Sequence, residues 1–289
     1  MNKQKKIIIS ASRRTDIPAF YMDWFMSCIN RGYFKVENPY NNKQSIFPAS
    51  TKEIHTIVFW SKNYDYFIKT RSGEKLIDKG YNLFFHFTIN SNQKILEPFV
   101  PLLDQKLKQL EYLSKNFFID SIRWRFDPIC FFKNDSSNIC NNLSDFKIIA
   151  NYASNLGIKN CITSFMNNYN KIKKRVKSYN NFEFFFPDNE KKIEILLSME
   201  KILNNYNINL FTCCEKDLIE NIPIDSKIKP NSCIDNNLFI NLFGEKLSLK
   251  KDTGQRAHDG CNCMISKDIG SYKKQPCQHK CLYCYASIN

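Results

Sequence analysis

The sequence has no long hydrophobic run. No stretch of its 289 residues approaches the ~18 uncharged apolar residues of a membrane span. The first residues, MNKQKKIIISASRR, run straight into charge and lack the apolar core of a signal peptide. We therefore expect a cytoplasmic protein with no membrane partner. Because that compartment keeps thiols reduced, the twelve cysteines indicate metal ligation and not a disulfide framework.

Arginine is scarce. The formal charge is +14, but only eight of the 42 basic residues are Arg. A cationic protein suits a polyanionic partner such as nucleic acid. Abundant Lys, Asn and Ile are also what an AT-rich coding sequence produces without selection for binding. Nucleic acid is therefore one candidate partner among several.

Short strand-like and longer helix-like segments alternate, which predicts parallel βαβ units. The predicted strands are residues 6–12, 55–61, 82–90, 120–128, 159–165 and 208–214. The clearest helical periodicity covers residues 99–116, 144–157 and 189–206. Ser144 and Asn189 stand where N-caps would, and Gly157 where a C-cap would.

Two glycine-rich motifs are missing, and this bears on the fold. Neither G-x-G-x-x-G nor G-x-x-x-x-G-K-[ST] follows a predicted strand, so the usual cradles of doubly wound sheets are absent. We therefore favour a barrel. The expected fold is α/β, with a partial (β/α)6 TIM-like barrel over residues 1–215 and a cysteine-rich C-terminal extension over residues 216–289.

The carboxyl ends of barrel strands carry the chemistry, and in this chain those ends are polar. Arg13, Arg14 and Asp16 follow the first strand and suit a carboxylate of a cofactor or substrate, or form an ordinary ion pair of a loop. Arg125 and Asp127 share one face of a strand and suit either a ribose or substrate contact or a buried structural pair. We take these five as cofactor-binding candidates.

Cys277, Cys281 and Cys284 form the motif C-x3-C-x2-C. A loop of this spacing can bind one face of a 4Fe-4S cluster and leave the fourth iron without a protein ligand. That open iron can chelate S-adenosylmethionine (SAM), whose reductive cleavage yields methionine and a 5'-deoxyadenosyl radical.

A zinc knuckle is the alternative for this motif. His279, or Cys261 with Cys263, would complete its four ligands. The three-then-two spacing is unusual for zinc, and an aromatic residue, Tyr283, precedes the last cysteine. We therefore favour iron and sulfide. The other histidines, His55, His86 and His258, stand singly and are expected to be structural.

The cysteine motif also carries a resemblance. C-x3-C-x-aromatic-C followed by Tyr-Ala resembles the cluster loop of the radical SAM enzymes, and CLYCYA is similar to that of spore photoproduct lyase and its relatives. VFWSKNYDYF (58–67) resembles a strand ending in a Thr-Lys-Asn-Pro type motif in that branch, with Ser61 and Tyr64 replacing Thr and Pro. FHFTIN (85–90) resembles the strand that follows it. The resemblance implies that Lys62 faces the cofactor pocket.

The order of the motifs departs from that superfamily. There the cluster loop normally follows the first strand, whereas here it lies within the last fifteen residues. The chain resembles a permuted arrangement in which the extension lays the cluster over the barrel mouth. SASRRTDIPAFY near the start, CID at 233–235 and DIGSY before the final cysteines resemble the bacterial family numbered 1848 among domains of unknown function. This resemblance covers nearly the full length and implies no substrate.

Four further positions in the last third of the chain carry thiols: Cys213 or Cys214, Cys233, Cys261 and Cys263. Four thiolates are the complement of a fully ligated cluster, so we expect an auxiliary 4Fe-4S cluster, with a structural zinc ion as the alternative. Cys214 is preferred to its neighbour, because Cys213 should point the other way along an extended chain.

These features predict an oxygen-sensitive radical SAM enzyme with one or two 4Fe-4S clusters. Its substrate would be a nucleic acid, a peptide or a metabolite, and its partner an external one-electron reductant of the flavodoxin or ferredoxin type. The alternative is a zinc-stabilised nucleic-acid-binding module without catalysis. The basic charge and the aromatic, basic segment 167–189 support that alternative, although the segment also suits a solvated helix and a core-docking run. A third hypothesis is a cluster-containing electron carrier or sensor. Such a protein would need no substrate pocket, so the polar strand ends argue against it.

Overall fold

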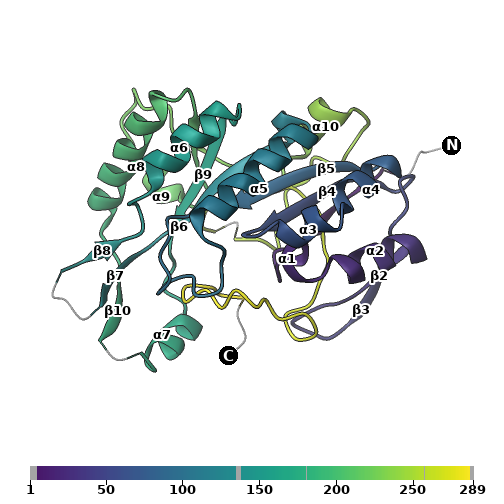
Figure 1. Cartoon of the computed structure of the whole chain (residues 1–289), viewed down its shortest axis with the longest axis horizontal. Coiled ribbons are helices and arrows are strands. Elements are labelled where there is room, and N and C mark those ends of the chain that lie inside the picture. Colours follow the sequence, from purple (N-terminus) through teal and green to yellow (C-terminus); the bar gives the residue numbers. More distant parts are fainter. Residues whose placement is uncertain (1–4, 135–137, 180, 257, 287–289) are drawn as a thin grey trace.

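One parallel sheet of eight strands forms the centre of the molecule (Figure 1). The computed structural model describes residues 5–134, 138–179, 181–256 and 258–286. The strand order is β12-β11-β9-β6-β5-β4-β1-β13. The six longer strands are β1 (Ile7–Ala11), β4 (Ile54–Ser61), β5 (Asn82–Thr88), β6 (Ile122–Ile129), β9 (Asn160–Phe165) and β11 (Asn209–Thr212), and the edges are β12 (Lys229–Pro230) and β13 (Lys267–Asp268). All six predicted strands are present, and the α/β class is confirmed.

The sheet has two free edges within the described ranges. No pairing joins β12 to β13 there. Both edge strands are two residues long, so they add little hydrogen bonding to the six strands between them. The strand pairing of the described residues therefore does not close the sheet into a barrel.

The helices follow the strands along the chain. The longer ones are α2 (Met22–Arg31), α5 (Leu103–Asn116), α6 (Phe146–Asn155), α8 (Asn189–Asn204) and α10 (Asn236–Phe243). The shorter ones are α1 (Ile17–Phe20), α3 (Asp65–Lys69), α4 (Ser72–Asp78), α7 (Asn170–Val176), α9 (Lys216–Ile219) and the 3-10 turn η1 (Ile119–Ser121). The three helices predicted from periodicity are α5, α6 and α8. In Figure 1 they lie side by side over the sheet.

Two of the predicted N-caps are wrong by one residue. Asp188 caps α8, because its carboxylate accepts a hydrogen bond from the Lys191 backbone at 2.8 Å. Asp145 holds the N-cap position of α6. Asp and Asn cap helices equally well, so composition alone does not choose between adjacent polar residues. Gly157 follows α6 with a left-handed φ of 81°, as expected at a helix end.

Alternate residues of each strand point to opposite faces, and different parts of the chain cover the two faces. On one face, Phe59, Phe85 and Trp124 pack among the helices in the main core. On the other face, Val58 and Phe84 pack against Phe239 of α10 and against the segment around Cys233 and Cys263. The last third of the chain therefore covers the second face of the sheet. The boundary between residues 215 and 216 remains a prediction.

Two small antiparallel sheets flank the central one. β2 (Tyr33–Glu37) pairs with β3 (Gln44–Pro48), and β7 (Phe131–Asn134) pairs with β8 (Cys140–Asn141) and β10 (Phe182–Phe185). The segment 167–189 forms α7 and β10 within this part. Phe182 and Phe184 of β10 are buried, whereas the lysines of α7 face solvent. The segment is thus a solvated helix followed by a docked aromatic strand.

Among the described residues, no helix has both the length and the apolar character needed to cross a bilayer.

Candidate functional site

The cysteine loop, which we define as residues 276–285, crosses the edge of the sheet where the strands end (yellow in Figure 1). The Leu282 backbone donates to the Leu96 carbonyl at 2.8 Å, beyond β5. The Tyr285 hydroxyl donates to the Arg13 carbonyl at 3.1 Å, beyond β1. The loop is therefore attached to the segments that follow β5 and β1, the two strands on either side of β4.

Asp16 holds one side of the cysteine loop. Its carboxylate accepts hydrogen bonds from the Ser61 hydroxyl at 2.7 Å, from the Lys62 backbone at 2.9 Å and from His279 Nε2 at 2.9 Å. The His279 ring also packs on Phe20, with 4.7 Å between ring centroids. Asp16 was predicted to bind a cofactor, and in this structure its acceptors are occupied by the protein itself.

Glu97 holds the other side. The buried Tyr283 hydroxyl donates to its carboxylate, Lys62 Nζ lies 2.9 Å away, and Asn90 donates at 2.9 Å. Although burial opposes ionisation, Lys62 and Lys106 lower the pKa of Glu97 to about 2. Lys62 thus lies beside the cysteine loop, and its charge is paired with Glu97.

The three thiols of the loop lie in a poorly solvated environment. Burial raises the pKa of Cys277 to about 12 and that of Cys281 well above its usual value. The charges of Cys277 and Cys284 each act on Cys281, so the three side chains are within electrostatic range of one another. Metal binding at such thiols must displace their protons, which makes the affinity pH-dependent.

Five cysteines converge on the face of the sheet covered by the last third of the chain. Cys213 Sγ lies 3.6 Å from Cys233 Sγ and 3.7 Å from Cys214 Sγ. Further thiol contacts join Cys233 to Cys263, Cys263 to Cys261, and Cys261 to Cys214. The contacts close a ring, which we call the five-thiol group.

The predicted orientation of Cys213 is wrong. The prediction assumed an extended chain through both adjacent cysteines, in which their side chains would diverge. Instead, Cys214 adopts a left-handed φ of 60°, so the chain turns immediately after β11. Both thiols therefore face the same group. The other predicted members, Cys233, Cys261 and Cys263, lie in it as well.

Several N–H groups point at the sulfur atoms of the five-thiol group. Arg125 Nη1 lies 3.0 Å and Asn231 Nδ2 3.1 Å from Cys233 Sγ. The Ile234 backbone donates to Cys263 Sγ at 3.4 Å. Hydrogen bonds from the Cys213 and Cys263 thiols, with the nearby Arg125, hold the pKa of Cys233 well below its usual value. The pKa of Cys261 is lowered as well, by hydrogen bonds from Cys214 and Cys263, so Cys233 and Cys261 are both prepared to bind a metal as thiolates.

In the described part of the chain, no three His, Cys, Asp or Glu side chains are arranged to hold a single metal ion. The donor set of the five-thiol group nevertheless fits a thiophilic group. It consists of thiols alone, and soft thiolate ligands select zinc and iron-sulfur clusters. In such sites, N–H groups that donate hydrogen bonds to the ligand sulfurs tune the reduction potential of the bound group. All twelve cysteines are free thiols.

A cavity of about 600 Å³ lies beside the five-thiol group. Besides those five cysteines, its charged and aromatic lining is Arg13, Arg14, Trp60, Arg125, Asp127, Tyr40, Tyr169, Arg256, Asp268, Tyr272 and Tyr285. Tyr285 directly follows Cys284, so the cavity lies between the five-thiol group and the cysteine loop. Four of the six predicted cofactor-binding residues line it, and the other two, Asp16 and Lys62, hold the loop.

Arg13 and Arg125 lie near the same aromatic ring in this cavity. Their guanidinium groups lie 5.7 Å and 5.4 Å from the ring of Trp60. Arg125 pairs with Asp127 at 2.6 Å, and Arg13 pairs with Asp268 at 3.1 Å. The predicted face shared by Arg125 and Asp127 is thus directed into the cavity, with the two side chains paired to each other.

Sequence reasoning missed some residues of the site. Glu97 lies in a loop without a recognisable motif, and no local signal marks it as the centre of a buried network. Arg256 lines the cavity from the extension, and its only signal is the scarcity of Arg in a lysine-rich chain. Tyr272 has no signal of its own.

Comparison with family models gives one match, described as a domain of unknown function, DUF1848, which covers residues 8–286. Comparison with the curated proteins finds no match.

Proposed function

The chain belongs to the DUF1848 family, as its motifs indicated, and because that family has no assigned function we propose from the cysteine motif and the site geometry that the chain is a radical SAM enzyme with two metal sites. The cysteine loop would hold a 4Fe-4S cluster through Cys277, Cys281 and Cys284. When bound, that cluster supplies the electron that cleaves SAM, and the resulting radical abstracts hydrogen from a substrate.

One observation carries the proposal. The three cysteines of a C-x3-C-x2-C loop lie at the edge where parallel strands end, and a polar cavity adjoins them through Tyr285. That edge is where α/β proteins bind their ligands. A cavity of about 600 Å³ also exceeds the low end of the range for small-molecule sites.

The chain's own residues would position these parts. Asp16 and Glu97 hold the cysteine loop against the sheet through His279 and Tyr283, respectively. Trp60 and Arg125 offer an aromatic face and a charge inside the cavity. Because these side chains are largely buried, they are held in place before any ligand arrives.

A partial (β/α)6 barrel belongs to the same proposal. The six longer strands lie beside one another in the order in which they occur along the chain. That order is the winding of a barrel, whereas the strand order of a doubly wound sheet reverses in the middle. The cavity would then open at the barrel mouth.

The five-thiol group would hold an auxiliary 4Fe-4S cluster. The N–H donors to Cys233 and Cys263 support a redox-active group, because such hydrogen bonds tune cluster potentials. We also propose an external reductant of the flavodoxin or ferredoxin type and a location in the cytoplasm, where the twelve thiols stay reduced.

A structural zinc ion is the second candidate for the five-thiol group. Sulfur distances of 3.6 and 3.7 Å suit neighbouring ligands of one tetrahedral ion, for which zinc–sulfur bonds of ~2.3 Å imply about 3.8 Å. If zinc alone is bound, the protein is the nucleic-acid-binding module of the alternative hypothesis.

The test is metal and sulfide analysis of anaerobically purified protein, with an electron paramagnetic resonance spectrum of the reduced form before and after SAM is added. We expect iron, sulfide and a signal that changes with SAM, and Cys281→Ala should abolish that change. Cys28→Ala is the matched control, since Cys28 is equally buried but lies in α2. Zinc without sulfide would reject the radical enzyme.

A further inference from the structure

Half of the chain's arginines line one cavity. The chain has eight Arg, and four of them line the cavity between the two cysteine sites, whereas none of the described lysines does. The lining also contains two carboxylates. The four guanidinium groups are Arg13, Arg14, Arg125 and Arg256, and the two carboxylates are Asp127 and Asp268. The cavity therefore carries more cationic groups than carboxylates.

All four arginines have protein partners, Arg256 through the Tyr169 hydroxyl at 3.5 Å. Arg125 donates to Cys233 Sγ at 3.0 Å and to Asp127 at 2.6 Å. Arg14 Nη1 donates to two backbone carbonyls, at 3.0 and 3.2 Å. Their first role is to hold the walls of the cavity.

Arg13 differs from both. Its Nη1 lies 3.1 Å from Asp268 and 4.0 Å from Asp252, and its side chain is only 14% exposed. Its Nη2 is buried and has no hydrogen-bond partner among the described residues. A buried N–H group without an acceptor is costly, and native proteins rarely leave one. An acceptor atom of a ligand would remove that cost.

The charged end of Arg13 lies near the five-thiol group, although its backbone carbonyl accepts a hydrogen bond from Tyr285 of the cysteine loop. Its charge interacts with Cys233 and Cys263 of the five-thiol group, and its guanidinium lies 5.7 Å from the ring of Trp60. The SAM of the proposed function would be bound at Cys277, Cys281 and Cys284 instead. An anion bound by the Arg13 side chain would therefore lie beside the five-thiol group.

We propose that Arg13 anchors a binding site for an anionic group of the substrate, a carboxylate or a phosphate. The guanidinium fork matches either group, and Arg13 lines a cavity in which four guanidinium groups face two carboxylates. This inference depends on the proposed function only in calling the ligand a substrate, because anion binding itself requires no catalysis.

The experiment titrates the anaerobically purified native protein with sodium phosphate and, separately, with sodium acetate at constant ionic strength. Binding is followed by calorimetry and by the melting temperature. We expect at least one anion to bind and to raise the melting temperature. Saturation by phosphate alone indicates a phosphate ester as substrate, and saturation by acetate alone indicates a carboxylic acid. Failure of both to bind would overturn the proposal.

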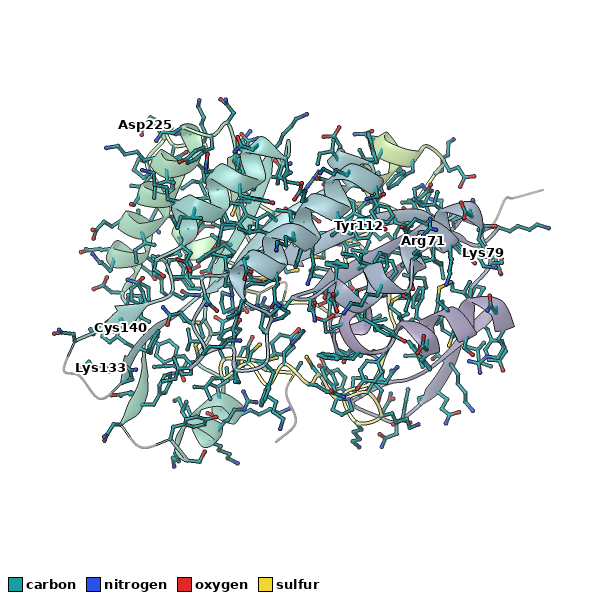
Figure 2. The ribbon with its side chains drawn as sticks, in the orientation of Figure 1. Arg71, Lys79, Tyr112, Lys133, Cys140 and Asp225 are labelled. Carbon is teal, nitrogen blue, oxygen red and sulfur yellow. The ribbon has the colours of Figure 1, made fainter. Side chains whose placement is uncertain are left out.

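Variants then locate the site. Arg13→Lys keeps a charge near Asp268 but loses the fork, so it should weaken binding roughly tenfold, the effect of one charge-assisted hydrogen bond. The control is Arg71→Lys, at the start of α4 on the surface, where the side chain is 74% exposed (Figure 2). Unchanged binding by Arg13→Lys would place the anion elsewhere and reject the proposal.

A competition experiment separates substrate from cofactor without any variant. SAM added to the phosphate-saturated native protein should leave phosphate bound, because the two sites are distinct. Displacement of phosphate by SAM would assign Arg13 to the carboxylate of the cofactor and overturn the inference while supporting SAM binding. Phosphate binding in a protein that does not bind SAM would uphold the anion site and reject the proposed function.

Discussion

His279 Nε2 donates a hydrogen bond to the Asp16 carboxylate at 2.9 Å, and the two buried residues are 263 positions apart in the sequence. The same Asp16 oxygen accepts the Lys62 backbone N–H, so one carboxylate joins the loop after β1, the loop after β4 and the cysteine loop. The position of the cysteine motif on the sheet therefore depends on a pairing that no local pattern contains.

We predict that His279→Ala loosens the cysteine loop. The substitution removes one charge-assisted hydrogen bond from the buried Asp16 carboxylate, which keeps those from Ser61 and the Lys62 backbone, and it should lower the free energy of unfolding by about 2 kcal/mol. Urea denaturation measures this loss, and limited proteolysis should cut near residues 276–285 sooner. His258→Ala, whose side chain is fully exposed, serves as the control. Equal stability of the two variants would contradict the role given to His279.

Glu97→Gln should be more damaging. The carboxylate is 5% exposed and balances Lys62 and, at 3.9 Å, the buried Lys106. Removing one charge of a buried cluster leaves the others uncompensated, at a cost of about 3–5 kcal/mol. Chemical denaturation measures this loss of unfolding free energy. Glu194→Gln, which breaks an exposed pair with Lys191, should have no measurable effect. A small effect of Glu97→Gln would mean that the lysines are neutral or solvated.

Substitution of the five-thiol group should change the metal content. If each site holds a 4Fe-4S cluster, the purified protein contains about eight irons, and Cys233→Ser should leave about four. The response of the reduced spectrum to SAM should persist in that variant, because the cysteine loop is intact. Cys140→Ser is the control, since Cys140 lies on β8 at the outer edge of the small sheet (Figure 2). Full iron content in Cys233→Ser would exclude it as a ligand.

Protonation of His55 should destabilise the fold in acid. His55 is buried, with Nε2 2.7 Å from the Gly244 carbonyl and Nδ1 2.7 Å from the Thr56 hydroxyl. Burial lowers its pKa below the ordinary value of about 6.5. The unfolded chain therefore binds the proton first, and stability falls as the pH drops below about 6.5. Denaturation midpoints of native protein and His55→Gln between pH 8 and 5, values chosen to bracket that range, should converge in acid. A constant difference between the midpoints of the two proteins across this pH range would refute the assignment of the acid sensitivity to His55.

Much of the fold is predictable from local pattern. Strands such as β4 and β5 are continuous apolar runs, the signature of a parallel sheet buried on both faces, and α5, α6 and α8 follow the helical period. These signals come from residues that are neighbours in the chain. The exact N-caps of α6 and α8 differ because adjacent polar residues compete for the same position.

The candidate site is predictable only in part. The spacing of Cys277, Cys281 and Cys284 is visible in the sequence because the motif is a single short loop. The sequence predicted that Cys214, Cys233, Cys261 and Cys263 act together, and the structure adds Cys213 as the fifth thiol of the group. The left-handed turn at Cys214 decides that both neighbours take part, and such a turn at a residue other than glycine leaves no clear signal.

The sequence by itself determined the α/β class, the six strands and the spacing of the cysteine motif, because each follows from periodicity or spacing over a few residues. Only the tertiary structure decided that Asp16 and Lys62 hold the cysteine loop, whereas Arg13 and Arg125 face a cavity. Arg13, Asp16 and Arg125 were predicted from strand ends and Lys62 from a resemblance. Their roles differ because segments far away in the chain, around Glu97, Cys233 and His279, supply their partners. Contacts of that range depend on how loops pack across the sheet, which no local pattern encodes.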